Sequence, residues 1–382
     1  MDNVLFGSLE EKSVKIAFFS HLDLNLYLFR LPIMKELVKR GHIVYALTPK
    51  GDVFDKFKEF GIDAIDYNIK RDSLNIFNEL NTIIQVKKII KDLNIDILHT
   101  FMHKPNIYGN LTKVDNIINT ITGLGSFFVD ESLKSKIVRS IIKSLYKFTT
   151  KYAKKVVFQN SDDLNYFISQ NIIPSYKAVL IKSSGVDTEF FKPQKPNKEL
   201  LKELNIDRKK PVVLMIARVI KDKGVNEYIK AASILKDKAN FLYVGDIDKG
   251  NKNTFLPNWE NVKYLGFRKD IKDLISISDI VVLPSYYREG VPRTLLEAAS
   301  MGKALITTNS VGCKEVVIDN YNGFLVPIKD YISLSKKIEV LISNPLLREK
   351  FGKNSRELVI KEFDVKIVVD KYLKLYEEIL SV

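Results

Sequence analysis

Two glutamates eight residues apart, Glu289 and Glu297, lie in the stretch of this sequence with the most chemical promise, SDIVVLPSYYREGVPRTLLEAASMG at 278–302. Its apolar run Ile280–Leu283 predicts a buried parallel strand, followed by a loop and a helix. Glu289 then lies at the C-terminal end of the strand, near helix N–H groups that suit a phosphate. The pattern predicts a pocket for a phosphorylated and hydroxylated ligand, although such a glutamate pair also occurs by chance.

Two basic residues precede this stretch at another predicted strand end. Arg218 and Lys223 follow the apolar run Val212–Ile216, in the sequence ARVIKDKG. A guanidinium and an ammonium at that position can neutralise a diphosphate. Because exposed basic residues are common, the pair alone does not separate a diphosphate site from an ordinary surface loop.

His103 is expected in the loop beyond the strand Ile97–Thr100. A neutral imidazole there can exchange hydrogen bonds with a substrate hydroxyl, or it can serve only the local structure. Zinc binding by His99 and His103 is disfavoured, because the segment is expected to be strand and loop and lacks the H-E-x-x-H pattern.

A glycine-bearing loop follows the apolar run Ile117–Ile121. Backbone amides of Thr122, Gly123, Gly125 and Ser126 could contact a second ligand on the acceptor side. A plain turn explains the glycines equally well.

The elements that must position these residues alternate between strand and helix. Strands are predicted at 14–20, 43–47, 64–67, 97–100, 156–159, 178–182, 212–216, 240–245, 262–265, 280–283 and 304–307. This alternation predicts parallel sheets covered on both faces, with ligands at the C-terminal strand ends. The first strand-to-helix loop, SHLDLNLYLFR, contains no glycine, which argues against a dinucleotide-binding dehydrogenase.

The chain length predicts two domains, because 382 residues exceed one core of ordinary size. The stretch FFKPQKPNK at 190–198 is the most linker-like in the chain. We therefore expect an N-terminal acceptor-side domain at 1–190 and a C-terminal donor domain at 191–364. The amphipathic final helix, 365–382, is long enough to cross back to the first domain.

Composition excludes several classes of protein. The net charge of +14 indicates an anionic partner, and 46% hydrophobic with 28% charged residues is typical of a globular chain. No apolar run is long enough to span a bilayer, and MDNVLFGSLEEKS does not resemble a leader, so a cytoplasmic location is expected. The single cysteine, Cys313, excludes an internal disulfide and makes a Cys/His metal cage improbable.

The segment 132–155, SLKSKIVRSIIKSLYKFTTKYAKK, holds eight basic residues and no acidic one. Arg139, Lys143 and Lys147 recur every four residues beside a second, apolar stripe, which predicts a basic amphipathic helix or helix pair. Such a helix can lie on an anionic membrane surface, or it can pack in the fold with a solvated basic face. Nucleic acid is disfavoured because few aromatic residues are placed for base stacking.

Taken together, these motifs resemble one known family. The E-x7-E pair, the earlier Arg218 and Lys223-Gly224, His103 in the first half and Gly312 with Glu315 after it are similar to the retaining nucleotide-sugar glycosyltransferases of family four. The resemblance covers nearly the whole chain. It implies an α/β architecture, the GT-B fold, with two facing doubly wound Rossmann-like domains.

The resemblance also implies roles for individual residues. Arg218 and Lys223 neutralise the departing diphosphate, Glu289 binds donor-sugar hydroxyls and His103 contacts the donor sugar near the reacting centre. Glu297 holds the ribose, and residues 266–268 flank the base. The full set of other implied donor-binding residues is Gly266, Phe267, Arg268, Gly290, Val291, Pro292, Thr294, Leu295 and Glu297. The substrate is a UDP-sugar, and neither a cofactor nor an obligatory metal is expected.

A metal at Asp246-Ile247-Asp248 is the secondary alternative. A D-x-D pair holds a divalent ion in another nucleotide-sugar enzyme fold, but that fold is a single domain, unlike the tandem pattern here. This loop is also more acidic than the glycine-rich version common in family four.

Within the family, SHLDLNLYLFRLPIMKEL, TGLGSFFVD, PVVLMIAR and LPSYYREGVPRTLLEA resemble transferases of bacterial protein N-glycosylation. Those enzymes add N-acetylgalactosamine to undecaprenyl-diphosphate-linked N,N'-diacetylbacillosamine. The likeness implies a polyprenyl-diphosphate-linked acceptor and peripheral attachment to the inner face of the cytoplasmic membrane. A capsule or lipopolysaccharide transferase with another donor and acceptor is the alternative, and an inactive membrane-surface binding module is the alternative of a different class.

Overall fold

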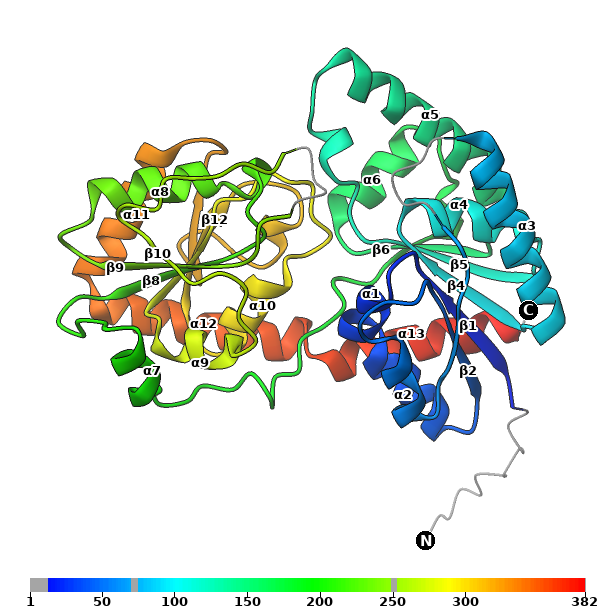
Figure 1. The fold of residues 1–382 in the computed structure, drawn as a ribbon, viewed down its shortest axis with the longest axis horizontal. Helices are drawn as coiled ribbons and strands as arrows, with labels where there is room; N and C mark the ends of the chain where they lie inside the picture. The colour runs from blue at the N-terminus through cyan, green and yellow to red at the C-terminus, as the bar shows by residue number, and fades with distance from the viewer. Residues whose placement is uncertain (1–12, 70–74, 249–252, 382) are drawn as a thin grey trace, which may run out of the picture.

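Two parallel sheets form the framework of the molecule (Figure 1). The computed structural model describes residues 13–69, 75–248 and 253–381. Within them, a seven-stranded sheet has the order β3-β2-β1-β4-β5-β6-β7 and a six-stranded sheet the order β10-β9-β8-β11-β12-β13, with every strand pair parallel. The predicted arrangement of two doubly wound α/β units is confirmed.

The first sheet is covered by helices on both faces. Alternate residues of its inner strand β1 enter different cores, because Ile16 and Phe18 join one buried cluster and Ala17 and Phe19 the other. The strands are β1 Lys15–Phe19, β2 Ile43–Leu47, β3 Asp63–Ile65, β4 Ile97–Phe101, β5 Asn116–Ile121, β6 Lys155–Phe158 and β7 Ala178–Leu180. The helices are α1 Asp23–Phe29, α2 Leu31–Lys39, α3 Ile76–Leu93, α4 His103–Thr112, α5 Leu133–Thr149 and α6 Ser161–Ser169.

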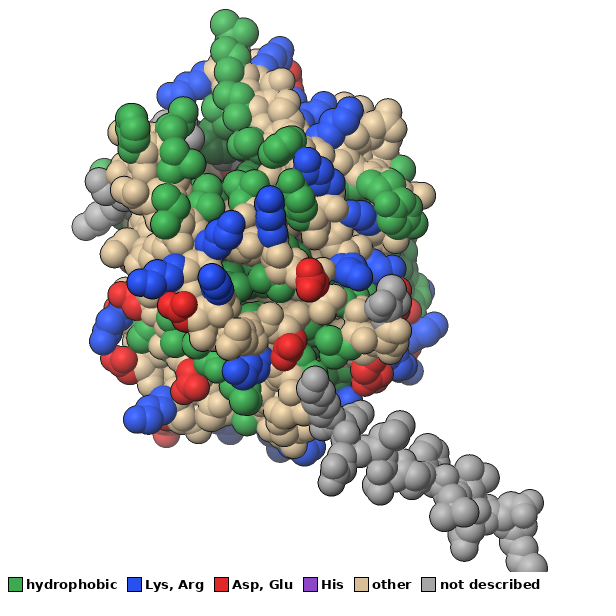
Figure 2. Space-filling view, turned by 90° about the vertical axis from the view of Figure 1, so that its right-hand side faces the viewer, with side chains coloured by type: hydrophobic (Ala, Val, Ile, Leu, Met, Phe, Trp, Pro, Cys, Tyr) green, Lys and Arg blue, Asp and Glu red, His purple; other side chains and the backbone are tan. Residues whose placement is uncertain are grey.

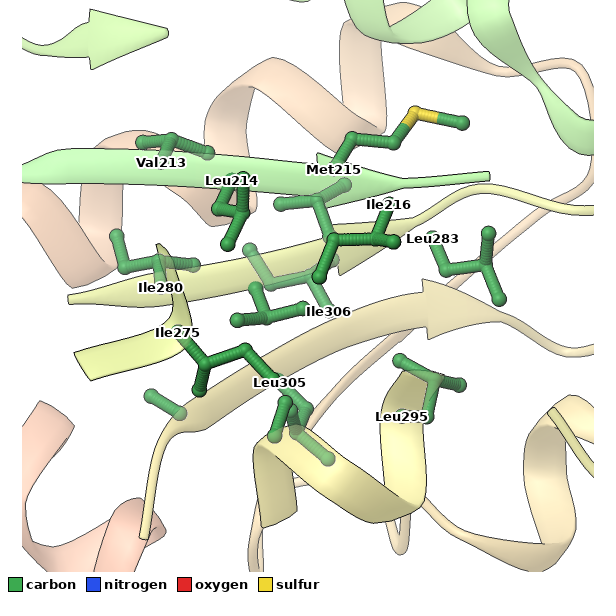
Figure 3. Close-up of a cluster of buried hydrophobic side chains, with 14 of the residues drawn as sticks. Val213, Leu214, Met215, Ile216, Ile275, Ile280, Leu283, Leu295, Leu305 and Ile306 are labelled. Carbon is green, nitrogen blue, oxygen red and sulfur yellow. The ribbon is translucent and has the colours of Figure 1, made fainter. Parts of the chain in front are cut away.

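The second sheet has a continuous apolar core, part of which is drawn in Figure 3. Strands β8 and β11 are buried on both faces, as expected for central parallel strands. The strands are β8 Val212–Ile216, β9 Asn240–Val244, β10 Lys263–Tyr264, β11 Ile280–Leu283, β12 Ala304–Thr308 and β13 Gly323–Val326. The helices are α7 Lys198–Glu203, α8 Val225–Ile234, α9 Ile271–Ile277, α10 Arg293–Ser300, α11 Tyr331–Ser343 and α12 Pro345–Glu362.

The final helix, α13 Val365–Leu380, returns to the first sheet as expected (Figure 1). Its inner face packs into one of the N-terminal cores through residues such as Val368 and Tyr372. The hydroxyl of Tyr376 meets the buried Nδ1 of His99 at 2.6 Å, and Thr120 meets the other ring nitrogen at 2.7 Å. Both nitrogens of His99 are thus used inside the fold.

Some expected boundaries were wrong. His103 begins helix α4 and does not lie in a loop. The sequence of this helix lacks a hydrophobic period of 3.6 residues because its buried face is partly polar. Asn106 donates to the Thr120 carbonyl and the Tyr146 hydroxyl, and Asn110 donates to the Asn119 side chain. Likewise α1 begins at Asp23, within the segment SHLDLNLYLFR that was expected to form the first strand-to-helix loop.

The Tyr376 hydroxyl should matter for stability. We expect Tyr376→Phe to lower the free energy of unfolding by about 1 to 3 kcal/mol, because the buried His99 nitrogen loses its partner. Denaturant unfolding measures this change. As a control, Lys374→Ala removes only an exposed pair with Asp370 and should leave the free energy of unfolding almost unchanged. Equal effects of the two substitutions would contradict the role assigned to the hydroxyl.

Candidate active site

The strand order places the candidate site at one edge of each sheet. It reverses at β1, which lies between β2 and β4, and at β8, which lies between β9 and β11. Loops at the carboxyl ends of the strands on either side of such a reversal leave a crevice for a ligand. The loops after β8 and β11 carry Arg218, Lys223 and Glu289, so the sequence pattern and the topology indicate the same place.

The carboxylate of Glu289 and the ammonium of Lys223 form a close, largely buried ion pair. Ser285 donates a second hydrogen bond to the same carboxylate oxygen at 3.1 Å. The Lys223 ammonium also lies 5.2 Å from the centre of the Tyr287 ring. Two residues that are 66 positions apart in the chain, on different loops, therefore hold a carboxylate and an ammonium in contact.

Arg218 is paired in a similar way but is half exposed. Its Nη1 donates to the Asp248 carboxylate at 2.5 Å. The two carboxylates of the Asp246-Ile247-Asp248 loop have different partners, because Asp246 accepts from the Ile247 N–H. Among residues 13–69, 75–248 and 253–381, no three His, Cys, Asp or Glu side chains gather closely enough to hold a metal ion.

The second glutamate of the pair lies on α10. Glu297 is buried, and its carboxylate accepts from Nε of Arg293 at 2.8 Å. Burial raises the pKa of Glu297, and the nearby Arg293 opposes that effect. Arg293 also donates to the Leu28 carbonyl and lies over the Phe29 ring, so it joins the two domains. Sequence reasoning missed Arg293, although its spacing of four residues from Glu297 on a helix was the available signal.

The remaining predicted donor residues take different positions. Pro292 precedes α10, while the Leu295 side chain is wholly within the core, so only its backbone can face a ligand. Gly266 accepts from the Gly245 N–H at 2.9 Å, and the Phe267 ring is 68% exposed. The Arg268 guanidinium is held by Asp270 and Glu203. Of the remaining three, Gly290 is buried, and Val291 and Thr294 are half-buried.

His103 is the first residue of α4 and directly follows Met102, whose φ is +74°. That conformation costs energy in a residue other than glycine, and such residues cluster at functional sites. The Nδ1 atom lies 3.0 Å from the Tyr146 hydroxyl and Nε2 lies 3.3 Å from the Leu124 carbonyl. Burial lowers the pKa of His103, which favours the neutral ring. Both nitrogens already have protein partners.

The glycine loop after β5 touches the loop that carries Glu289. The Gly125 N–H donates to the Arg288 carbonyl at 3.2 Å. A side chain on Gly123 would place its Cβ 2.5 Å from the Gly290 nitrogen, and one on Gly290 would lie 2.6 Å from the Thr122 carbonyl. The structure thus brings Thr122, Gly123 and Gly125 to the loop between β11 and α10, residues 284–292, which is called the donor loop below. The side chain of Ser126 lies outside the described part of the chain.

The three basic residues of α5 that recur every four positions, Arg139, Lys143 and Lys147, do not join this cluster. Arg139 donates to the carbonyls of Phe127 and Asp130, at 3.1 and 2.9 Å. Lys143 donates to Gln170 at 2.7 Å, and Lys147 is exposed. Only part of the predicted basic stripe is therefore free on the surface.

Two protein-family models match the chain. The model described as "Glycosyl transferase 4-like" matches residues 15–160, and the model described as "Glycosyl transferases group 1" matches residues 196–358. Each match contains most of the strands of one sheet and its ligand-side loops.

Individual proteins match over most of the chain. It is 37% identical over 378 residues to the N,N'-diacetylbacillosaminyl-diphospho-undecaprenol alpha-1,3-N-acetylgalactosaminyltransferase of Campylobacter jejuni, covering 96% of this chain and 100% of that protein. It is 28% identical to the UDP-Gal:alpha-D-GlcNAc-diphosphoundecaprenol alpha-1,3-galactosyltransferase of Escherichia coli, covering 84% of each. The Anabaena protein HepE, solved with UDP and glucose, superposes with a TM-score of 0.80 at 18% identity, covering 95% of this chain and 99% of that chain.

The two facing sheets, the loops at their carboxyl ends and the superposition on HepE define the GT-B class of two-domain α/β proteins. Given the identity to the C. jejuni transferase over nearly its whole length, the chain belongs to family four of the glycosyltransferases. It is a hexosyltransferase, and the family expected from the sequence is confirmed.

The thiol of Cys313 provides a probe of this site. Burial, together with the nearby Glu289 carboxylate, raises the pKa of Cys313 to about 11. Since the thiolate is the reactive form, we expect no reaction of the native protein with a thiol reagent at pH 8 and one equivalent after unfolding. Titration with a chromogenic disulfide measures both values. Rapid reaction of the native protein would contradict the packing around Gly312 and Cys313.

Proposed function

We propose that this enzyme transfers N-acetylgalactosamine from UDP-N-acetylgalactosamine to undecaprenyl-diphosphate-linked N,N'-diacetylbacillosamine, with retention and an α linkage, in the assembly of a protein N-glycan. The observation that best supports sugar transfer is the Lys223–Glu289 pair at the sheet edge. On this proposal the pair joins a cation that binds the diphosphate to a carboxylate that binds sugar hydroxyls. The 37% identity to the C. jejuni enzyme supports the donor and acceptor. On the same analogy, the bond forms at the 3-position.

In the described structure each donor-facing cation is paired with a carboxylate. Lys223 contacts Glu289 and Arg218 contacts Asp248. On our proposal the diphosphate of the donor takes over both cations, and the exchange leaves Glu289 free to accept hydrogen bonds from the sugar. Arg218 and Lys223 supply the positive charge at the diphosphate, so no obligatory metal is needed.

Other predicted residues surround the same ligand. The backbone of Gly290–Pro292 and the N–H groups of Thr294 and Leu295 receive the sugar and diphosphate, Glu297 the ribose and Gly266–Arg268 the base. His103 contacts the donor sugar once its bond to the Leu124 carbonyl is exchanged.

The reaction then needs little covalent chemistry from the protein. An acceptor hydroxyl oxygen attacks the anomeric carbon on the face from which the diphosphate leaves, and the bond between that carbon and the phosphate oxygen breaks. The acceptor proton passes to the departing phosphate oxygen. Positioning and charge stabilisation supply the rate enhancement.

We also infer peripheral attachment to the inner face of the cytoplasmic membrane, where a polyprenyl-linked acceptor would be met. The apolar stripe of α5 faces solvent, with Ile137 and Ile141 each 54% exposed. Helix α3 adds a second row that includes Phe77, which is 78% exposed, and both helices pack against α4. Figure 2 shows hydrophobic side chains gathered on this end of the molecule with Lys and Arg around them. In the described part of the chain, no helix is long and apolar enough to cross a membrane.

Product analysis tests the transfer. Purified protein, the bacillosamine-linked polyprenyl diphosphate and a panel of UDP-sugars should yield one added N-acetylhexosamine only with UDP-N-acetylgalactosamine, with or without EDTA. Lys223→Ala should lose turnover by several orders of magnitude, because the charge on the leaving group is no longer neutralised. Mass spectrometry measures the product. Galactose transfer instead would give this chain the donor of the E. coli relative, and loss of product with EDTA would refute the metal-independent proposal.

Vesicle sedimentation tests the membrane surface. The double substitution Ile137→Asp and Ile141→Asp should abolish cosedimentation with phosphatidylglycerol vesicles, because two carboxylates must enter the interface. UDP binding should remain unchanged. A matched control, Ile234→Asp with Ile360→Asp, alters two exposed isoleucines of the other domain and should sediment as the wild type does. Equal sedimentation of both double variants would refute the membrane role of α5.

A further inference from the structure

The donor loop contains a charged residue that the proposed function leaves unexplained. Arg288 directly precedes Glu289, and its Nε donates to the Asp163 carboxylate at 2.6 Å. Asp163 belongs to α6 of the N-terminal domain and its side chain is 0% exposed, while that of Arg288 is 15% exposed. The guanidinium also lies over the rings of Tyr166 and Phe128, at 4.8 and 5.7 Å from their centres. A buried ion pair therefore joins the two domains next to the donor site.

Asn160 forms a second connection at the same point. Its buried side-chain amide donates to the second Asp163 oxygen at 2.9 Å. The same amide reaches the backbone carbonyls of Glu289 and Gly290, at 3.1 and 3.2 Å. Its own oxygen accepts from the Asp163 N–H at 2.7 Å and caps α6. A rigid helix start in one domain thus holds the backbone that carries Glu289 in the other.

A third connection lies beside these two. Glu315 accepts from the Ser161 N–H and hydroxyl, at 3.1 and 2.6 Å, and pairs with Lys182 at 2.9 Å. Although burial alone would raise the pKa of Glu315, these hydrogen bonds hold it below its usual value. The turn between β6 and α6 therefore contacts two loops of the other domain, the loop that carries Glu289 and the loop that carries Glu315.

We propose that Asp163 and Asn160 are positioning residues that act through Arg288 and the Glu289–Gly290 backbone. They fix the donor carboxylate only when the two domains are closed. A buried ion pair contributes less to stability than to geometry, since any misaligned closed arrangement leaves a charge desolvated and unpaired. This inference rests on the proposed role of Glu289, and it makes part of the donor site a product of domain closure.

The adjacent residue supplies a matched control. Asp162 also pairs across the domains, with Lys314 at 3.0 Å, but that pair is partly exposed. Exposed pairs contribute little. Asp162→Asn should therefore leave turnover within about twofold of the wild type.

Steady-state kinetics test the proposal. We expect Asp163→Asn to lower kcat about 10- to 100-fold, while the dissociation constant for UDP, whose proposed contacts lie in the C-terminal domain, stays within about twofold. Thermal unfolding verifies that each variant is folded. A kcat for Asp163→Asn equal to that of Asp162→Asn would overturn the proposal.

A double-mutant cycle distinguishes positioning from direct contact with substrate. If Asp163 acts through Arg288, the double variant of Asp163→Asn and Arg288→Gln should be no slower than the slower single variant. Multiplicative losses would overturn the proposal. If Asp163→Asn does not fold, Asn160→Ala is compared with Asp162→Asn in the same assays.

Small-angle scattering gives a readout that does not depend on the acceptor. With UDP bound, Asp163→Asn should show a larger radius of gyration than the wild type, and Asp162→Asn should not. Unchanged radii would overturn the closure role. Failure of the wild type to use the bacillosamine acceptor would instead contradict the proposed function and leave this comparison intact.

Discussion

The close approach of backbone to backbone at Gly123, Gly290 and Gly312 is the constraint on which the site depends. A Cβ on Gly123 or Gly312 would lie 2.5 Å from backbone atoms of Gly290. No side chain fits between these loops, so the two domains meet at the donor loop itself. The position of Glu289 is consequently set from both domains.

Charge pairing is the second organising feature. The cations predicted to receive a diphosphate, Lys223 and Arg218, are each paired with a carboxylate in the structure. This arrangement avoids an unpaired buried charge, which would be costly. On the proposed function, a donor diphosphate exchanges partners within this network and does not enter a site of uncompensated positive charge.

The N-terminal domain presents two different surfaces, one that contacts the donor loop and one with exposed apolar side chains. The strand ends and the turn before α6 contact the donor loop, while α3 and α5 carry exposed apolar rows. Helices α3 and α5 both pack against α4, over the same seven-stranded sheet whose strand ends meet the Glu289 loop. The inward face of α5 explains why Arg139 contributes more to local structure than to the surface, because its guanidinium holds the 127–130 segment.

The sequence alone determined the alternation of strands and helices, because buried strands such as Ile280–Leu283 and long amphipathic helices such as Ile76–Leu93 have strong local patterns. It also indicated Arg218, Lys223, Glu289 and Glu297 by type and spacing. It did not reveal α4, whose buried face is polar, nor the contacts of Asn160, Asp163 and Arg293 with the other domain. Those contacts join residues more than 100 positions apart, and no local periodicity encodes which loops meet; only the packing of the two sheets and the return of α13 decided that.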